Sequence, residues 1–96
     1  MKSPCVYIMA SGRNGTLYCS VISDLARRAY EHRTGACEGY TKKYNWTKLV
    51  WYEPSLRMED ATQREKQIKG GNRVSKLAAI AAMNPTWADL YETLKN

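Results

Sequence analysis

The amino-acid sequence predicts a small α+β fold in which helices flank a three-stranded antiparallel sheet. Its 96 residues are enough for one modest hydrophobic core, because a chain of this length cannot divide its apolar residues between two. Two β-rich runs joined by an Asn-Gly turn open the chain, and apolar residues recur at helical spacing in its second half. We therefore expect one domain over residues 1–96, with a core at about 4–83 and a helical tail at 84–96.

The first two elements are predicted to form a β-hairpin. Residues 5–10 and 16–22 are rich in β-branched, aromatic and other strand-forming residues. Between them stand Asn14 and Gly15, a pair typical of tight hairpin turns because both tolerate positive φ. The chain therefore opens with two antiparallel strands.

A short helix is predicted to follow the hairpin. Ser23 stands at the expected N-cap position, and Asp24 places a negative charge in the first turn, where the helix dipole favours it. Gly35 is a stop signal at the other end. The helix should run from about residue 24 to residue 33.

The second half of the chain predicts a third strand and two helices. Residues 48–52 are rich in strand-forming residues, and Pro54 closes this strand. Residues 58–69 and 74–83 both show apolar side chains at helical spacing, separated by two glycines. The predicted order is ββαβαα with a small element in the tail, which is an α+β arrangement.

The net charge of +6 predicts a polyanionic partner. The chain has 15 lysines and arginines against 9 acidic residues, a balance that favours binding to phosphates. The longest apolar run near the start, residues 5–10, is too short to cross a bilayer or to serve as a secretion signal. We therefore expect a cytoplasmic protein that binds nucleic acid and no membrane, and we assume a monomer.

The three cysteines are expected to be free thiols. Cys5, Cys19 and Cys37 are widely and irregularly spaced, which matches neither a zinc-binding pair nor an even set of disulfides. Buried free cysteines are typical of a reducing compartment.

One acidic residue lies where the predicted helix at 58–69 should pack. The apolar stripe that ends at Ile68 includes Glu65. A structural explanation is that Glu65 lies at the edge of the stripe and pairs with Lys66 or Lys69, or reaches water. A functional explanation is a carboxylate that points into a cleft and binds a metal ion.

Four further residues are candidates for chemistry. Arg28 and His32, the only histidine, are spaced so that both lie on one side of the first helix. An arginine can stabilise a developing phosphorane, and a histidine can move protons near neutral pH. Tyr7 and Tyr18 lie on the two hairpin strands, where aromatic residues are also expected for packing alone. The chain nevertheless has seven tyrosines and no phenylalanine, which favours a use for some of the hydroxyl groups.

Together these residues resemble the signature of the GIY-YIG endonuclease superfamily, in particular its small single-domain bacterial members. Cys5-Val6-Tyr7 resembles the first signature tripeptide and Tyr18-Cys19-Ser20 the second. Arg28 follows at the family's separation, and His32 occupies the position of a histidine found in many members. Residues 64–69 resemble the helix that carries the metal-binding glutamate. The resemblance implies a three-stranded antiparallel sheet flanked by helices, in agreement with the order predicted above.

The resemblance also implies an activity, the hydrolysis of phosphodiester bonds in DNA. Glu65 would hold a single divalent ion, Mg²⁺ or Mn²⁺, and Arg28 would contact a non-bridging phosphate oxygen. Tyr7 would be the general base or its relay, Tyr18 would orient the water or the phosphate, and His32 would assist as a further catalytic residue. Such a nuclease would be structure-selective and would serve DNA repair, recombination or nucleic-acid processing. We expect these five side chains to line one shallow basic cleft.

Two departures from the family pattern leave an alternative open. Cys5 and Ser20 stand where the family usually has glycine, and a Cβ at Ser20 could obstruct the approach of a ligand to the backbone. The alternative is a catalytically weakened or inactive domain that acts as a nucleic-acid-binding module. In both cases nucleic acid would be contacted by seven basic residues: Lys42, Lys43, Arg64, Lys66, Lys69, Arg73 and Lys76.

Overall fold

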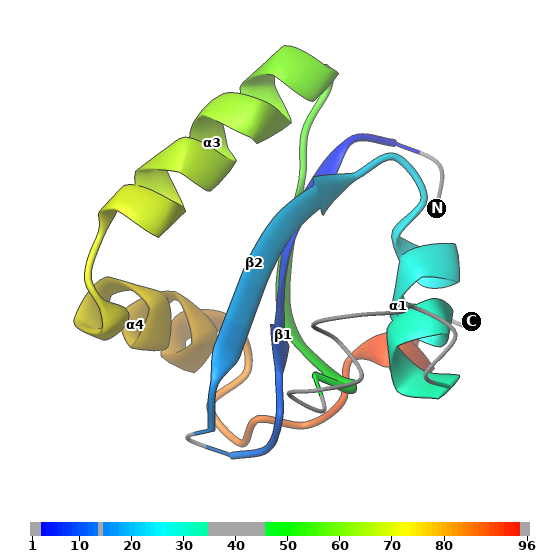
Figure 1. The fold of residues 1–96 in the computed structure, drawn as a ribbon, viewed down its shortest axis with the longest axis vertical. Helices are drawn as coiled ribbons and strands as arrows, with labels where there is room; N and C mark the ends of the chain where they lie inside the picture. Colours follow the sequence, from blue (N-terminus) through cyan, green and yellow to red (C-terminus); the bar gives the residue numbers. More distant parts are fainter. Residues whose placement is uncertain (1–2, 14, 35–45, 95–96) are drawn as a thin grey trace.

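The fold has the predicted order of strands and helices. The computed structural model describes residues 3–13, 15–34 and 46–94, and Figure 1 shows a sheet with helices on both sides. Within these ranges, no helix is both long and apolar enough to cross a membrane. The elements are β1 (Cys5–Ala10), β2 (Leu17–Ile22), α1 (Leu25–Thr34), β3 (Lys48–Pro54), α3 (Met58–Gly70), α4 (Arg73–Met83) and α5 (Tyr91–Leu94). The α+β class, the three-stranded antiparallel sheet and the ββαβαα order are confirmed.

The sheet has β1 at its centre and β2 and β3 at its edges. Both pairings are antiparallel and the strand order is β2-β1-β3. Every residue of β1 is buried, as expected for a strand covered on both faces. The pairing of β1 with β3 shifts between Ile8 and Met9, whose partners are Trp51 and Leu49. Val50 is therefore the additional residue of a β-bulge.

The two faces of the sheet are covered by different helices (Figure 1). On one face α1 and α5 cover a cluster made by alternate residues of β1 together with Leu25, Ala29 and Leu49. On the other face α3 and α4 cover a cluster that includes Ala61, Ile68 and Ile80. Because strand side chains alternate between faces, each residue of β1 belongs to one cluster only.

The first helix begins one position later than the sequence predicts. Ser23 was expected to be the N-cap, but it is exposed and precedes the helix. The carboxylate of Asp24 instead accepts a hydrogen bond from the backbone N–H of Arg27 at 3.3 Å, which is the N-cap interaction. A carboxylate and a hydroxyl are both good caps, so the neighbouring residues could not be ranked from sequence alone.

The segment after α4 packs against the outer edge of β3. Asn84 is 5% exposed and its Nδ2 donates to the carbonyl of Val50 at 3.2 Å. The backbone N–H of Leu90 donates to the carbonyl of Leu49 at 2.8 Å, and Asp89 Oδ1 accepts from the N–H of Leu49 at 3.2 Å. The predicted tail is thus bound to the sheet, at the position of the bulge.

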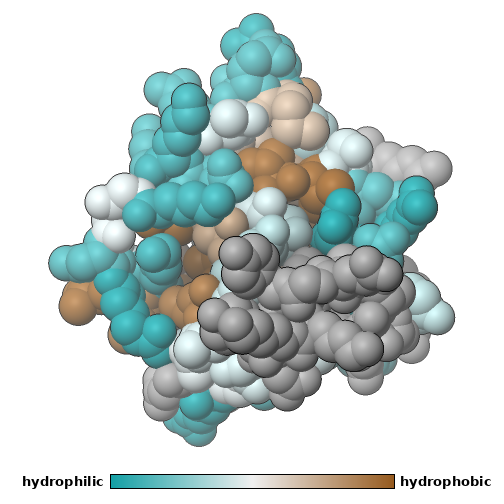
Figure 2. Space-filling view, viewed as in Figure 1, coloured by the Kyte–Doolittle hydropathy of each residue, from teal (hydrophilic) through white to brown (hydrophobic). Residues whose placement is uncertain are grey.

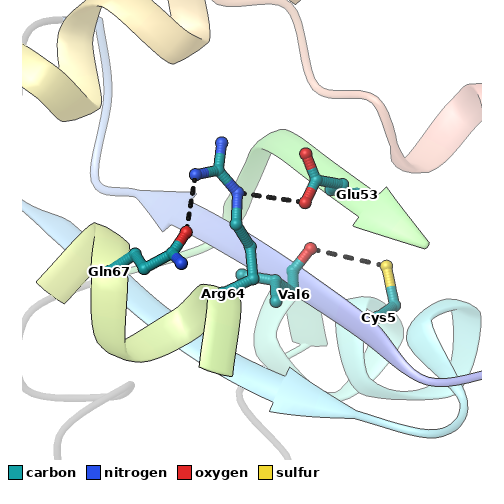
Figure 3. A network of polar contacts seen from close by, with 5 residues as sticks. All are labelled: Cys5, Val6, Glu53, Arg64 and Gln67. Carbon is teal, nitrogen blue, oxygen red and sulfur yellow. Dashed lines mark hydrogen bonds and ion pairs between the residues drawn. The ribbon is translucent and has the colours of Figure 1, made fainter. Parts of the chain in front are cut away.

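Two of the three cysteines are buried free thiols, as predicted. Burial is the main cause that raises the pKa of Cys5 to about 11, and its thiol donates to the carbonyl of Val6 at 3.4 Å (Figure 3). Cys19 is the other free buried thiol. Cys37 lies outside the described residues.

Candidate active site

The two signature tyrosines lie together on the face of the sheet that α1 covers. Tyr7 on β1 pairs with Ser20, and Tyr18 pairs with Met9, and directly paired residues share a face. The ring centroids of Tyr7 and Tyr18 are 6.4 Å apart at an interplanar angle of 58°. Tyr7 is only 2% exposed, whereas Tyr18 is partly buried at the edge strand. Of the two, Tyr18 is the one placed where a ligand at the edge could reach it.

Arg28 lies beside the end of β2, on the same side of the sheet as the tyrosines. Its side chain is 39% exposed, and its Nε is 3.5 Å from Glu31 Oε1. Together with Ile22 and Asp24 it lines a polar cavity of about 220 Å³. Ile22 follows Ser20 by two positions and shares its face. The structure therefore places Arg28 near the second signature strand.

Three predicted residues cannot be placed in this geometry. The backbone of His32 belongs to α1, but its side chain lies outside the described part of the chain. Lys42 and Lys43 lie outside the described residues altogether. Their roles stay predictions.

Glu65 lies on the other side of β2, between α3 and the sheet. Its side chain is 18% exposed, and its Oε2 is 3.3 Å from the Nζ of Lys69. Burial, and after it the charge of Glu65, raise the pKa of the Cys19 thiol on β2 to about 11, while Lys69, Lys76 and Arg64 act in the opposite direction. The acid and these three cations therefore all lie within electrostatic range of one position of the second signature strand.

The helices that carry Arg28 and Glu65 cover opposite faces of the sheet. Figure 1 shows α1 and α3 on either side of β2, which is an edge strand. The two helices therefore do not line a cleft on a single face of the sheet. A phosphodiester contacted by both residues would have to lie across the outer edge of β2. Convergence of all five candidate side chains stays a prediction.

The residues near Glu65 fit a hydrated divalent ion better than a closed metal site. In the described ranges, no group of three or more histidine, cysteine or acidic residues could hold a metal. Mg²⁺ commonly keeps several waters and takes one or two carboxylates together with substrate phosphate oxygens. A single shielded carboxylate such as Glu65 suits this kind of coordination. To bind the ion, Glu65 would have to give up its ion pair with Lys69.

The basic residues predicted to contact nucleic acid lie at different places on the surface. Arg64 donates to Glu53 Oε2 at 3.0 Å and to Gln67 Oε1 at 3.3 Å (Figure 3). Lys66 is exposed and lines a separate cavity together with Met58 and other residues of α3. Figure 2 shows hydrophilic side chains over α3 on this face of the molecule. Lys69, Lys76 and Arg64 all lie near Cys19, as Glu65 does.

Sequence reasoning missed one aromatic residue at this edge, Trp46. Its ring stacks on Tyr18 with centroids 4.8 Å apart and an interplanar angle of 23°. The only signal in the sequence is a tryptophan in a polar stretch just before the third strand. A residue outside the regular elements has no periodicity that would show which way it points.

Comparisons with known proteins show the family of the chain and agree with its fold. Residues 3–78 match the family described as the GIY-YIG catalytic domain. A UPF0213 protein of Staphylococcus saprophyticus is 32% identical over 81 residues, which cover 84% of this chain and 98% of that protein. A UPF0213 protein of Streptococcus agalactiae is 30% identical over 80 residues, or 83% and 91%. The solution NMR structure of a UPF0213 protein from Bacillus halodurans has a similar fold, with a TM-score of 0.56, 23% identity and 90% coverage of both chains.

Proposed function

The chain belongs to the GIY-YIG catalytic domain family, a nuclease family, and we propose that it is an endonuclease that hydrolyses phosphodiester bonds in DNA. The proposed cofactor is a single divalent ion, Mg²⁺ or Mn²⁺, and the proposed substrates are DNA structures rather than DNA sequences. None of the helices in the described ranges is identified as base-reading, so binding to DNA should be electrostatic.

The observation that carries this proposal is the position of Glu65. A carboxylate that is 18% exposed on a packing helix is costly unless it is paired or binds a ligand, and here Glu65 is paired with Lys69 at 3.3 Å, as the structural explanation expects. The proposal is that a metal ion replaces this lysine as the partner of Glu65. Glu65 adjoins β2, and Lys69, Lys76 and Arg64 lie near the same position. Glu65 would hold the ion, whose chemistry is Lewis-acid stabilisation of charge on the phosphate oxygens. The neighbouring cations would attract the polyanionic strand to the same edge.

Residues on the α1 side would complete the chemistry. Arg28 would supply a fixed positive charge to the developing phosphorane. Tyr18, at the edge strand, would orient the attacking water or the phosphate. Tyr7 is buried behind it and would relay a proton rather than meet the solvent, and His32 would assist this proton transfer.

A second candidate function has one specific observation in its favour. Ser20 lies directly opposite Tyr7 on the same face of the sheet, so its side chain enters the space beside the tyrosines. The family usually has glycine there, which leaves that space open. A domain that binds nucleic acid but cleaves it weakly or not at all is therefore the alternative.

The deciding experiment compares Glu65→Gln with the wild type in a DNA nicking assay with Mg²⁺, with Mn²⁺ and with EDTA. Metal-ion stabilisation amounts to several kcal/mol, so we expect cleavage to fall by at least about 100-fold. The matched control is Glu59→Gln, which removes the same charge from an exposed position of the same helix. It should cleave at the wild-type rate.

Metal-free DNA binding and thermal unfolding separate the two candidate functions. For the nuclease, Glu65→Gln should unfold within a few degrees of the wild type and bind DNA at least as well, because a negative charge has been removed. A folded wild type that binds DNA in a salt-dependent way but never nicks it would leave only the binding module. A Glu65→Gln variant that nicks at the wild-type rate would refute the role of Glu65.

A further inference from the structure

A cavity lies at the hairpin end of β2. The residues that line it have no catalytic role in the chemistry proposed above. Its volume is about 360 Å³, within the range of roughly 300–1,000 Å³ typical of small-ligand pockets. Five residues line it: Thr16, Leu17, Trp46, Arg73 and Lys76. They come from the start of β2, from the segment just before β3 and from the first turns of α4. Three parts of the chain that are distant in sequence therefore form one cavity.

The cavity lies at the same sheet edge as the candidate active site and has residues from both of its sides. Trp46 stacks on Tyr18, which faces the α1 side. Arg73 and Lys76 belong to α4, which covers the opposite face together with α3. Lys76 is also close enough to Cys19 to lower its pKa, as Glu65 is close enough to raise it. Lys76 thus lines the cavity and also lies within electrostatic range of the strand position that Glu65 influences.

The aromatic wall of the cavity is fixed in position. The ring of Trp46 is stacked at 23° on Tyr18, and its Nε1 donates to Thr16 Oγ1 at 3.0 Å. Tyr18 in turn contacts the buried ring of Tyr7. An indole held by a stack and a hydrogen bond gives a ligand a flat surface that need not be ordered on binding.

A second wall of the cavity, contributed by α4, is cationic. Arg73 donates to the carbonyl of Gly15 at 2.8 Å, which holds its guanidinium against the hairpin turn. With Lys76 it makes two cations among the five lining residues, and none of the five is acidic. A flat aromatic surface beside two cations is the combination that binds a nucleic-acid base and its phosphate.

We propose that this cavity binds an unpaired nucleotide of the DNA substrate, with its base against Trp46 and its phosphate at Arg73 and Lys76. The choice of DNA rests on the proposed function above. A base within a duplex has both faces covered by its neighbours and cannot stack on a side chain unless it leaves the helix. The ligand must therefore be single-stranded, as at a flap, a gap or the strand end of a branched structure. This cavity would make the enzyme prefer such DNA.

The tryptophans of this chain make the proposal directly measurable. Trp51 and Trp87 are 6% and 5% exposed in the core, whereas Trp46 is partly exposed at the cavity. Stacking of a base on an indole quenches its fluorescence, so the quenching should come from Trp46. In EDTA, oligothymidylate should quench the intrinsic fluorescence of the wild-type protein, and a blunt duplex of equal length should quench it far less.

Variants test the two walls separately, by the anisotropy of a labelled oligothymidylate in EDTA. Trp46→Leu should weaken binding by about 5- to 100-fold, the effect of losing one base stack. Lys76→Gln should weaken binding of single-stranded DNA several-fold and reduce its salt dependence by about one unit of slope. The matched control Arg57→Gln removes a cation from the far end of α3, where it pairs with Glu59 and Asp60, and should leave binding within about twofold of the wild type.

The outcomes distinguish this proposal from the proposed function. Suppose that the wild-type protein nicks DNA in Mg²⁺. If oligothymidylate then does not quench its fluorescence, or if Trp46→Leu and Lys76→Gln both bind oligothymidylate as the wild type does, the nuclease proposal stands and the nucleotide site is refuted. Quenching that Lys76→Gln weakens, in a protein that never nicks, supports the nucleotide site and overturns the nuclease. Equal loss of affinity in Lys76→Gln and Arg57→Gln would reduce the site to general charge attraction and would also overturn it.

Discussion

The two edge strands of the sheet, β2 and β3, have different surroundings in this fold. At β3 the chain after α4 returns and engages the backbone, with Leu90 bonded to Leu49 and Asn84 bonded to Val50. At β2, the strand pairs only with β1 among the described residues, and charged side chains from α1 and α3 flank it. Unpaired strand edges are liable to aggregate unless they are covered or charged. The β3 edge is covered and the β2 edge is charged, so we expect stability to depend on the first and function on the second.

The largest effect should come from Arg28→Ala at the β2 edge. Loss of one preorganised charge at a developing oxyanion costs about 100- to 1,000-fold in rate, so nicking should fall by that factor. The matched control is Arg27→Ala, because Arg27 is the neighbouring residue and also pairs with Glu31. It is 78% exposed, and nicking by this control should change less than about twofold. Equal losses in the two variants would show that α1 contributes only net charge.

The next effect is at the β3 edge, where Asn84→Ala should lower stability and leave the chemistry intact. The variant loses the bonds from Nδ2 to the carbonyls of Val50 and Ala88 and leaves a buried carbonyl without its partner. We expect a loss of about 2–3 kcal/mol, which in a domain of this size lowers the Tm by roughly 10–20 °C. Nicking per folded molecule, measured well below the Tm, should match the wild type.

Asn72→Ala is the control for this comparison. Asn72 is an exposed N-cap whose Oδ1 accepts from the N–H of Ser75 at 3.0 Å, and losing such a cap costs about 1 kcal/mol. If Asn84→Ala melts no lower than Asn72→Ala, the chain after α4 does not secure the β3 edge. If it also loses nicking while folded, the division between a structural and a functional edge is wrong.

The smallest effect concerns Ser20→Gly, which restores the usual family residue at the β2 edge. If the serine side chain crowds the space beside Tyr7, nicking should rise severalfold, while stability should fall by about 0.5–1 kcal/mol because glycine weakens a strand. Ser23→Gly, at an exposed position just after β2, should change neither quantity by as much. An unchanged rate in Ser20→Gly would remove crowding as a cause of weak activity.

Periodicity in the sequence was sufficient to predict the strands and helices, but not to predict which face of the sheet each helix covers. The position of Glu65 among packing residues is confirmed by its 18% exposure between buried Ala61 and Ile68, whereas Met58, at the start of the same stripe, is exposed. The same stripe cannot show which face of the sheet a helix covers. Arg28 and Glu65 were therefore expected in one cleft, although their helices lie on opposite faces.

Residues outside the regular elements were the least predictable. Asn84 follows a helix and precedes a proline, a pattern typical of a loop, but it is buried and bonded to β3. Trp46 precedes β3 and forms the aromatic wall of a cavity. The positions of both depend on contacts with residues distant in sequence, which neither propensity nor periodicity includes.

The central position of β1 also has a kinetic consequence. Ala10 pairs with Leu17 across a short turn on one side and with Lys48 across a much longer stretch of chain on the other. Closing a short loop costs less entropy and is faster than closing a long one. The β1–β2 hairpin should therefore form first, and β3 should join later, followed by the segment that contains Asn84. Destabilising changes in the hairpin should mainly slow folding, whereas changes at Asn84 should mainly accelerate unfolding.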